Sequence, residues 1–321
     1  MDTHLIISNL RNPTLLFFLL GLLAVVVKSD LKLPQQITKF ISLYLLFSIG
    51  FKGGLELAHN GFTAEVALTL GIAIVLALVI PVYSFFILKL RLNAANAGAI
   101  AATYGSVSAV TFVTAASFLA DRGIPFGGHM VAAMALMESP AIIIGIVLIR
   151  LVGKTNGGAT HSLWSVVREG LTNGSVLLIV GSLVIGMIAD EKQAEGIKPF
   201  TSDIFKGFLA LFLLEMGMVA GRRMGVFSQA GGFLLLFGVL MPFINAGLAI
   251  GLCHLFGIDR GNAFLLAVLA ASASYIAVPA ALRLAVPQAE PGLYIPMALV
   301  VTFPVNIVVG LPLYYQLVQT L

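Results

Sequence analysis

The sequence predicts an all-α polytopic membrane protein with ten transmembrane helices, arranged as two inverted five-helix repeats in which spans 4 and 9 are broken, crossing helices. Three observations predict this class: an apolar composition, ten long apolar runs, and motifs that recur in both halves. Of the 321 residues, 59% are hydrophobic and only 10% are charged, and the mean hydropathy is +1.04. Because soluble globular proteins carry about 25% charged residues, this composition excludes a soluble enzyme, a disordered protein and a nucleic-acid binder.

The predicted spans are apolar runs separated by short polar breaks. A membrane-crossing helix needs about 20 mostly apolar residues, and charged or turn-forming residues interrupt the runs, as at 28–34, 121–123 and 190–196. The runs are continuous rather than alternating, which indicates helices and not the strands of a barrel. In chain order the predicted spans are 14–27, 36–51, 63–89, 94–120, 127–152, 174–189, 203–220, 226–256, 261–284 and 292–320.

Lysine and arginine are unevenly distributed between the two sides of this predicted bundle. Connections after odd-numbered spans hold 11 of them, and the opposite side holds 7. Positive charge favours the cytoplasmic side, so both termini are predicted to lie outside. The predicted location of the protein is a bacterial inner membrane. The first residues lack a basic segment followed by a small-residue cleavage site, so no removed signal peptide is expected. The lone Cys253 indicates packing rather than a disulfide framework.

Motifs recur between the two halves at an offset near 166. Since each half holds five spans, an odd number, the second half is predicted to be inverted relative to the first, a recurrent transporter design. We therefore predict a first repeat at 1–152, a cytoplasmic connection at 153–173 and an inverted second repeat at 174–321. Chance similarity in a Gly-, Ala- and Leu-rich chain is the alternative, and the ordered series of matches disfavours it. The matches are Lys39, Gly50 and Gly54 with Lys206, Gly217 and Gly221; Asn96-Ala97 with Asn262-Ala263; Ser106 and Ser108 with Ser272 and Ser274; and Pro140 with Pro304.

Small residues cluster at the ends of span 2 and span 7, in the segments IGFKGG and MGMVAG. Small residues allow transmembrane helices to approach closely. We expect close helix packing to be their role.

Spans 4 and 9 carry Ser-x-Ser triplets at matching positions, with Gly105 before the first and Pro279 after the second. Gly and Pro at mid-membrane can interrupt a helix and free backbone groups. N-terminal helix ends then suit an anion, and C-terminal carbonyls suit a small cation. The serines could instead bond their own helix backbone, but their pairing in both repeats favours a binding site. The predicted substrate residues are Gly105, Ser106, Val107, Ser108, Ser272, Ala273 and Ser274.

Two acidic residues, Glu138 and Glu215, lie in apolar surroundings. A charge at the bilayer centre costs at least ~2.5–3.5 kcal/mol, so such residues usually line a pathway or have a partner. Glu138 is the predicted cation ligand or proton carrier, and Glu215 is the second candidate, which could pair with a nearby basic residue. Thr111, Thr302 and Asn306 would supply the oxygen ligands that a hard cation such as sodium prefers. No catalytic residues are predicted, because no HExxH, GxSxG or Walker pattern is present.

The chain resembles the sodium-dependent bicarbonate transporter family known from cyanobacteria, over nearly its whole length. The segments IGFKGGLEL, YGSVSAVTFVTA, ALMESPAI, EMGMVAGRR, LAASASYIAVPAALRLAVPQAEPGLYIPMAL and GLPLYYQL carry the resemblance. It implies a core and a gate domain, a homotrimer, and bicarbonate held between two broken helices with sodium beside it. It also implies that Gly105, Ser106 and Ser108 contact the anion from the first broken helix, that Ser272, Ala273 and Ser274 do so from the second, and that Glu138 stands where those members have Asp.

The chain departs from that family pattern in span 9. Ala273 replaces a serine, Tyr275 replaces an acid, and residues 278–280 replace a Gly-Pro-Pro segment. The missing acid favours one sodium rather than two. The 153–173 connection is short where cyanobacterial relatives carry long inserts, which argues against regulation by a PII-like protein.

The resulting prediction is sodium-coupled uptake of bicarbonate or a similar small anion by an elevator-like movement. The alternative is a proton-coupled or efflux carrier for an organic anion, with Glu138 as the proton site, on a bile-acid-symporter-like architecture. A receptor or scaffold is the least favoured, because paired broken helices would then have no role.

Overall fold

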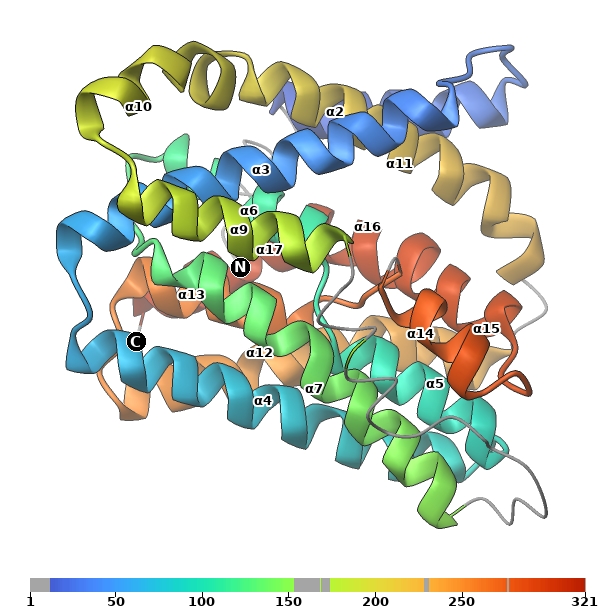
Figure 1. Ribbon diagram of the computed structural model, residues 1–321. Helices are drawn as coiled ribbons and strands as arrows, with labels where there is room; N and C mark the ends of the chain where they lie inside the picture. The colour runs from blue at the N-terminus through green and yellow to red at the C-terminus, as the bar shows by residue number, and fades with distance from the viewer. Residues whose placement is uncertain (1–11, 153–167, 169–173, 228–230, 276, 321) are drawn as a thin grey trace.

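The computed structural model describes residues 12–152, 168, 174–227, 231–275 and 277–320, and most of these residues lie in helices, with no strand among them (Figure 1). The predicted all-α class is confirmed. The helices are α2 (Pro13–Val26), α3 (Gln35–Asn60), α4 (Ala64–Lys89), α5 (Ala94–Gly105), α6 (Ala109–Ala120), α7 (His129–Val152), α9 (Gly174–Ile188), α10 (Glu191–Lys198), α11 (Phe205–Phe227), α12 (Gly232–Leu255), α13 (Arg260–Ala271), α14 (Ala277–Ala285), α15 (Pro291–Pro296), α16 (Phe303–Val305) and α17 (Leu311–Thr320). Short π-helices follow at η1 (Pro199–Asp203), η2 (Met297–Thr302) and η3 (Asn306–Gly310).

Long apolar helices make this a multi-pass membrane protein. Among the described residues, seven helical segments are long and apolar enough to cross a membrane, and three shorter apolar helices accompany them. The shorter ones are Pro13–Val26, Gly174–Ile188 and Arg260–Ala271. In chain order, all ten segments overlap the ten predicted ranges. The number of crossings, the inverted repeat and the orientation stay predictions, and the 153–173 connection lies outside the described residues except for Arg168.

Helix α3 is longer than predicted. The predicted span ends at 51, just before the charged Lys52, but the helix continues to Asn60. A charged side chain does not end a helix when it can reach a polar surface. Gly61 ends it instead, with a φ of 71° in the left-handed region, as is common just beyond helix C-termini.

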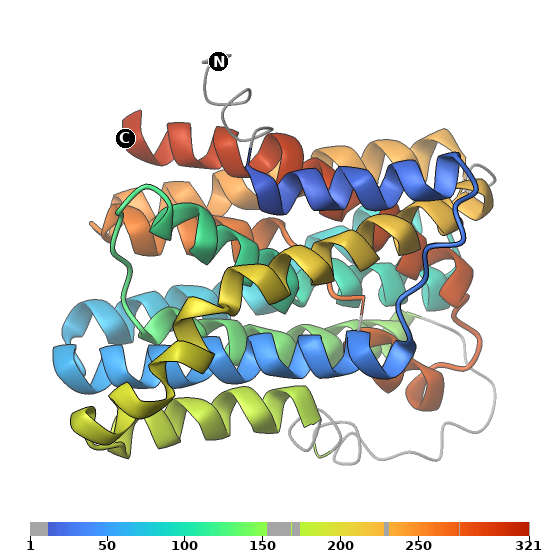
Figure 2. The ribbon, with the colours of Figure 1, turned by 90° about the horizontal axis from the view of Figure 1, so that it is seen from above.

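The helices α2, α3, α9 and α11 pack in two close pairs and occupy the upper part of Figure 1. In the pair of α3 and α9, a side chain at Gly54 would overlap the carbonyl oxygen of Leu183. In the pair of α2 and α11, a side chain at Gly217 would overlap the carbonyl oxygen of Phe18. Figure 2 shows α11 running obliquely toward α2. The predicted packing role of these glycines is confirmed.

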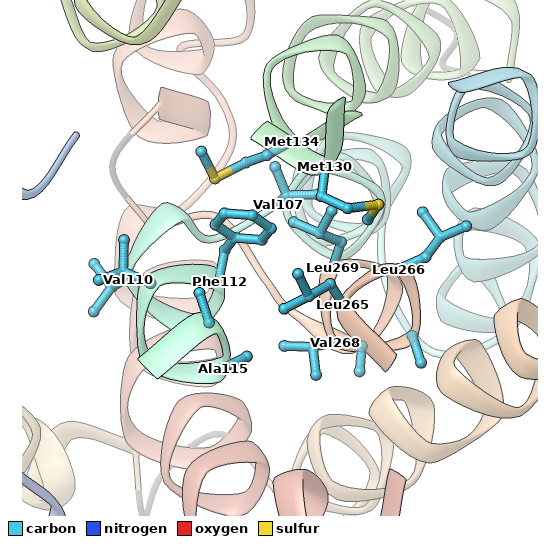
Figure 3. Packing of buried hydrophobic residues seen from close by; sticks show 14 of the residues in the cluster. Val107, Val110, Phe112, Ala115, Met130, Met134, Leu265, Leu266, Val268 and Leu269 are labelled. Atoms are coloured by element: carbon cyan, nitrogen blue, oxygen red, sulfur yellow. The ribbon is translucent and has the colours of Figure 1, made fainter. Parts of the chain in front are cut away.

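The other long helices form the larger part of the molecule. Helices α4, α5, α7, α12 and α13 lie in the lower part of Figure 1. Figure 3 shows Phe112 of α6, Met130 of α7 and Leu269 of α13 turned toward one another, and each is at most 1% exposed. Dense packing of these side chains holds α6 and α13 together in the interior of the molecule.

Two short extended segments interrupt the helices in this interior. Helix α5 ends at Gly105 and α6 begins at Ala109, while α13 ends at Ala271 and α14 begins at Ala277. The matched serines that follow α5 and α13 share one backbone conformation: φ −83° and ψ 167° at Ser106, φ −78° and ψ 168° at Ser272. We call the stretches 106–108 and 272–275 the first and second extended segments.

Candidate functional site

The two extended segments are hydrogen-bonded to each other. The backbone N–H of Ser108 donates to Ser272 Oγ at 2.9 Å. The backbone N–H of Ser274 donates to the carbonyl oxygen of Thr103, also at 2.9 Å. Ser272 Oγ donates in turn to the carbonyl oxygen of Leu269 at 2.8 Å. The serines predicted at matching positions therefore meet in space.

Ser106 and Gly105 connect the first extended segment to its neighbours. Ser106 Oγ donates to the carbonyl oxygen of Glu138 at 3.2 Å, which ties the segment to α7. A Cβ at Gly105 would lie only 2.6 Å from Cδ of Pro81. Only glycine fits at this close approach of α5 to α4, so Gly105 acts on the site through the backbone.

A cavity opens beside the two extended segments, with about 650 Å³ of space that includes its opening. One wall belongs to the extended segments, α6 and α7; the other belongs to α3, α9 and α11. We call it the inner cavity. It is lined by Ser42, Leu45, Leu46, Val107, Ser108, Ala109, Val110, Val113, Met134, Ala135, Glu138, Ser175, Ile179, Phe212, Ser274 and Tyr275.

The start of α6 supplies hydrogen-bond donors to this cavity. Ser108 caps the helix, accepting from the backbone N–H of Thr111 at 3.3 Å. Ala109 and Val110 are the first two residues of α6 and line the cavity. Their N–H groups have no carbonyl of the same helix to bond, and a helix start carries a partial positive charge. This end of the cavity is suited to an anion.

Glu138 supplies the acidic group of the inner cavity. It lies on α7, directly before Ser139 and Pro140, and it is partly exposed to the cavity. Among the described residues, its carboxylate has no hydrogen bond and no ion pair. The inner cavity therefore combines the carboxylate of Glu138 with the hydroxyl-lined start of α6. Together these groups can hold a small cation and an anion.

The structure places Thr302 away from the inner cavity. Its Oγ1 donates to the carbonyl oxygen of Gly238 at 3.0 Å and lies 2.7 Å from the hydroxyl of Tyr104. Both partners are buried protein groups, so this threonine ties η2 to α12 and α5. Its predicted role as a sodium ligand stays a prediction.

Asn306 and Thr111 are also buried outside the lining of the inner cavity. Asn306 Nδ2 donates to the carbonyl oxygen of Ala271 at 2.8 Å, and its Oδ1 accepts from the hydroxyl of Tyr314 at 2.9 Å. This bond satisfies the last carbonyl of α13. Neither residue is brought next to Glu138 in the cavity lining, and Ala273 is likewise buried outside it.

Glu215 lies on α11 outside the inner cavity and is only 7% exposed. One of its carboxylate oxygens has no hydrogen-bond partner. The expected basic partner is Arg222 on the same helix, which acts on it electrostatically but directs its guanidinium to the carbonyl oxygen of Leu31.

Sequence reasoning missed the contribution of Ser42 and Ser175, which line the inner cavity from α3 and α9. Each lies in an apolar span that also holds a second serine, Ser48 or Ser182, and no repeat or motif sets it apart. The sequence marks Tyr275 only as the replacement of an acid. Its hydroxyl points to the sulfur of Met216 on α11 at 3.6 Å, so it bridges the two walls.

Long apolar helices around a partly polar internal cavity are typical of a membrane transporter. The sequence comparison agrees and is more specific. The sequence profile of the Na+-dependent bicarbonate transporter superfamily matches residues 13–319. The chain belongs to this family, whose members are transporters and not enzymes. A comparison with curated protein sequences gives no significant match.

Proposed function

We propose that the protein takes up bicarbonate, or a similarly small anion, together with sodium, and that the inner cavity is the binding site. The observation that carries this proposal is one shared cavity: the start of α6, the hydroxyls of Ser108 and Ser274, and the unpaired carboxylate of Glu138 all line it. Family membership supports both solutes.

The anion would lie against the start of α6. The free N–H groups of Ala109 and Val110 and the hydroxyls of Ser108 and Ser274 can all donate to its oxygens. Ser106 and Ser272 would position this site rather than touch the anion, because their hydroxyls bond to Glu138 and Leu269 carbonyls.

Sodium would lie between the anion and Glu138. A cation there neutralises a carboxylate that otherwise has no partner among the described residues, and it attracts the anion, so each ion favours binding of the other. One sodium with one bicarbonate is electroneutral. Its driving force is the sodium gradient alone, ~1.4 kcal/mol per tenfold ratio.

Cross-repeat contacts support the inverted repeat on which this mechanism depends. Asn96, near the start of α5, accepts from the backbone N–H of Glu290, just before α15, at 2.9 Å. Its match Asn262, near the start of α13, accepts from the backbone N–H of Gly127, just before α7, at 2.8 Å. Each repeat thus makes the same bond to the other, as a two-fold axis requires.

The close packing of α3 with α9 and of α2 with α11 supports a division of the molecule into two domains that move relative to each other. In this proposal α2, α3, α9 and α11 form the gate domain, and the remaining helices form the core, with the inner cavity between them. Sliding of the core against the gate would carry the site across the membrane. The protein would cross a bacterial inner membrane ten times, with both termini outside, and it would assemble as a trimer.

A second candidate is an organic anion carrier coupled to protons through Glu138. The observation that favours it is the apolar gate wall of the inner cavity, where Leu45, Leu46 and Phe212 face the polar end. Such a wall would pack the carbon chain of a small carboxylate.

Ligand-dependent stability of the purified protein tests the proposed site. A ligand that binds only the folded state raises the unfolding temperature. Bicarbonate should raise it only when sodium is present, and the double substitution S108A/S274A should abolish the shift. Thr114→Val is the matched control, because Thr114 Oγ1 bonds within α6, to Val110, and does not line the cavity. A sodium-independent shift, or an undiminished shift in the double variant, would contradict the site.

A further inference from the structure

A second cavity lies further along the same interface as the inner cavity. Its space, including the part open to the surroundings, is about 1010 Å³, and we call it the mouth cavity. It lies between α3, α6, α7 and the η1–α11 junction. Its lining includes Ile49, Lys52, Glu56, Ala116, Val131 and Phe205.

The register of three helices places the two cavities in line. On α3 the lining passes from Leu46 to Ile49, and on α6 from Val113 to Ala116. Each step is three residues, about 4.5 Å along a helix axis. On α7 the step from Met134 to Val131 has the same length. The two cavities therefore lie about one helical turn apart along the same interface.

Lys52 is the basic residue of the mouth cavity that lacks a carboxylate partner. Its Nζ lies 5.2 Å from the centre of the Phe205 ring, and the side chain is half-buried. Among the described residues, no carboxylate oxygen lies within ion-pair distance of it. By contrast, Lys206, which also lines this cavity, is paired with Asp121.

Lys52 also lines a neighbouring cavity with Asp190, Glu195 and Lys198, and neither of these two carboxylates forms an ion pair with it. Glu56 lines the mouth cavity one turn further along α3, and it has an interaction of its own. Asp203 attracts Lys52 and Lys206 repels it at longer range. A half-buried lysine held over an aromatic ring, rather than against a carboxylate, keeps its donors for a passing solute.

We propose that Lys52 is an anion-capturing residue, and that the mouth cavity is the antechamber through which the transported anion reaches the inner cavity. This rests on the proposed function. With the predicted orientation, the mouth cavity faces outside, where uptake begins. A positive group within a low-dielectric cleft raises the local anion concentration and the rate of capture. It would not alter the rate of the movement that follows.

Transport kinetics in proteoliposomes test this role. Lys52→Gln should raise the KM for external bicarbonate about threefold or more at low ionic strength, with an unchanged maximal rate, and added salt should shrink the difference. Lys52→Arg should restore the wild-type KM. Lys198→Gln is the control, because Lys198 is a 61% exposed lysine paired with Glu195 outside the mouth cavity. An unchanged KM, or a lower maximal rate alone, would overturn the role.

A chemical measurement tests the antechamber independently of transport. Ala120→Cys places a thiol in the exposed lining of the mouth cavity, in a background where buried Cys253 is replaced by alanine. The thiol should react faster with an anionic than with a cationic methanethiosulfonate reagent, and Lys52→Gln should reduce that ratio about threefold or more. An unchanged ratio would refute the capture role even if bicarbonate proves not to be the substrate. Absence of sodium-driven uptake in the wild type, with the ratio reduced, would refute only the proposed function.

Discussion

The first and second extended segments have the same backbone and different side-chain bonding. Ser106 and Ser272 share φ and ψ within 5°. Ser106 Oγ, however, bonds outward to the α7 carbonyl of Glu138, whereas Ser272 Oγ bonds to its own half and accepts the N–H of Ser108. The first segment also opens a capped helix start into the inner cavity, through Ser108. The matched serines thus share a chain path but not a bonding role: Ser106 ties the first segment to α7, whereas Ser272 ties the second segment to α13 and to the first segment.

The largest expected effect on uptake comes from filling the inner cavity at the first extended segment. Ser108→Leu would place a bulky group in the inner cavity and remove the cap of α6. Bicarbonate uptake should fall at least about 100-fold, a loss of about 2.7 kcal/mol, while the lost cap costs only about 1 kcal/mol of stability. Uptake into proteoliposomes, with folding checked by gel filtration, measures this. Uptake near the wild-type rate would show that the first segment does not bind the substrate.

The next effect separates the two cation hypotheses at Glu138. Glu138→Gln keeps the side-chain volume and removes the charge. For a sodium site, the sodium concentration for half-maximal uptake should rise about tenfold, or ~1.4 kcal/mol, with uptake still sodium-driven. Initial rates over a sodium series at fixed pH measure it. Wild-type uptake that is indifferent to sodium, together with loss of uptake in the variant, would instead support proton coupling.

A smaller effect compares the supporting serines directly. Ser272→Ala would leave the buried N–H of Ser108 without an acceptor, costing about 1–3 kcal/mol of stability. Ser106→Ala removes only a donor to a carbonyl, so about 0.5–1.5 kcal/mol is expected. Thermal unfolding in detergent should therefore rank Ser272→Ala as the less stable variant. The reverse ranking would show that Ser272 is not the main hydrogen-bonding link between the two segments.

The smallest expected effect on transport concerns Tyr275, at the position where the resemblance to the cyanobacterial transporters implies an acid. Tyr275→Asp restores a carboxylate to the second segment. If it creates a second sodium site, each cycle would carry net charge, and a membrane potential would add ~2.3 kcal/mol per 100 mV to the driving force. Uptake under an imposed potassium diffusion potential should then become voltage-dependent in the variant and stay independent of voltage in the wild type. Voltage-dependent uptake by the wild type would exclude the electroneutral scheme.

The fold class and the positions of the helices followed from the sequence because both depend on local signals. Continuous apolar runs predicted the helices, and the change at Gly105 and Ser106 marked where α5 ends. The predicted span 36–51 stops short of the end of α3, because the helix continues past the charged Lys52 and ends only at Gly61, which has a positive φ.

The contacts of the site could be predicted only in part. Ser108, Ser274 and Glu138 share the inner cavity, in keeping with their unusual settings in the sequence. The sequence could not show that Asn306 bonds to the end of α13, nor that Ser42 faces the cavity. An apolar span does not reveal which way a single polar residue points, because that direction depends on its neighbours in space.

Uptake of labelled bicarbonate into proteoliposomes, with and without an inward sodium gradient at fixed pH, tests the central claim most directly. The proposed site predicts accumulation that requires the gradient and is abolished by Ser108→Leu. Folded wild-type protein that takes up no bicarbonate under either condition would contradict the claim, and it would show that this chain has kept the family's fold for a different solute.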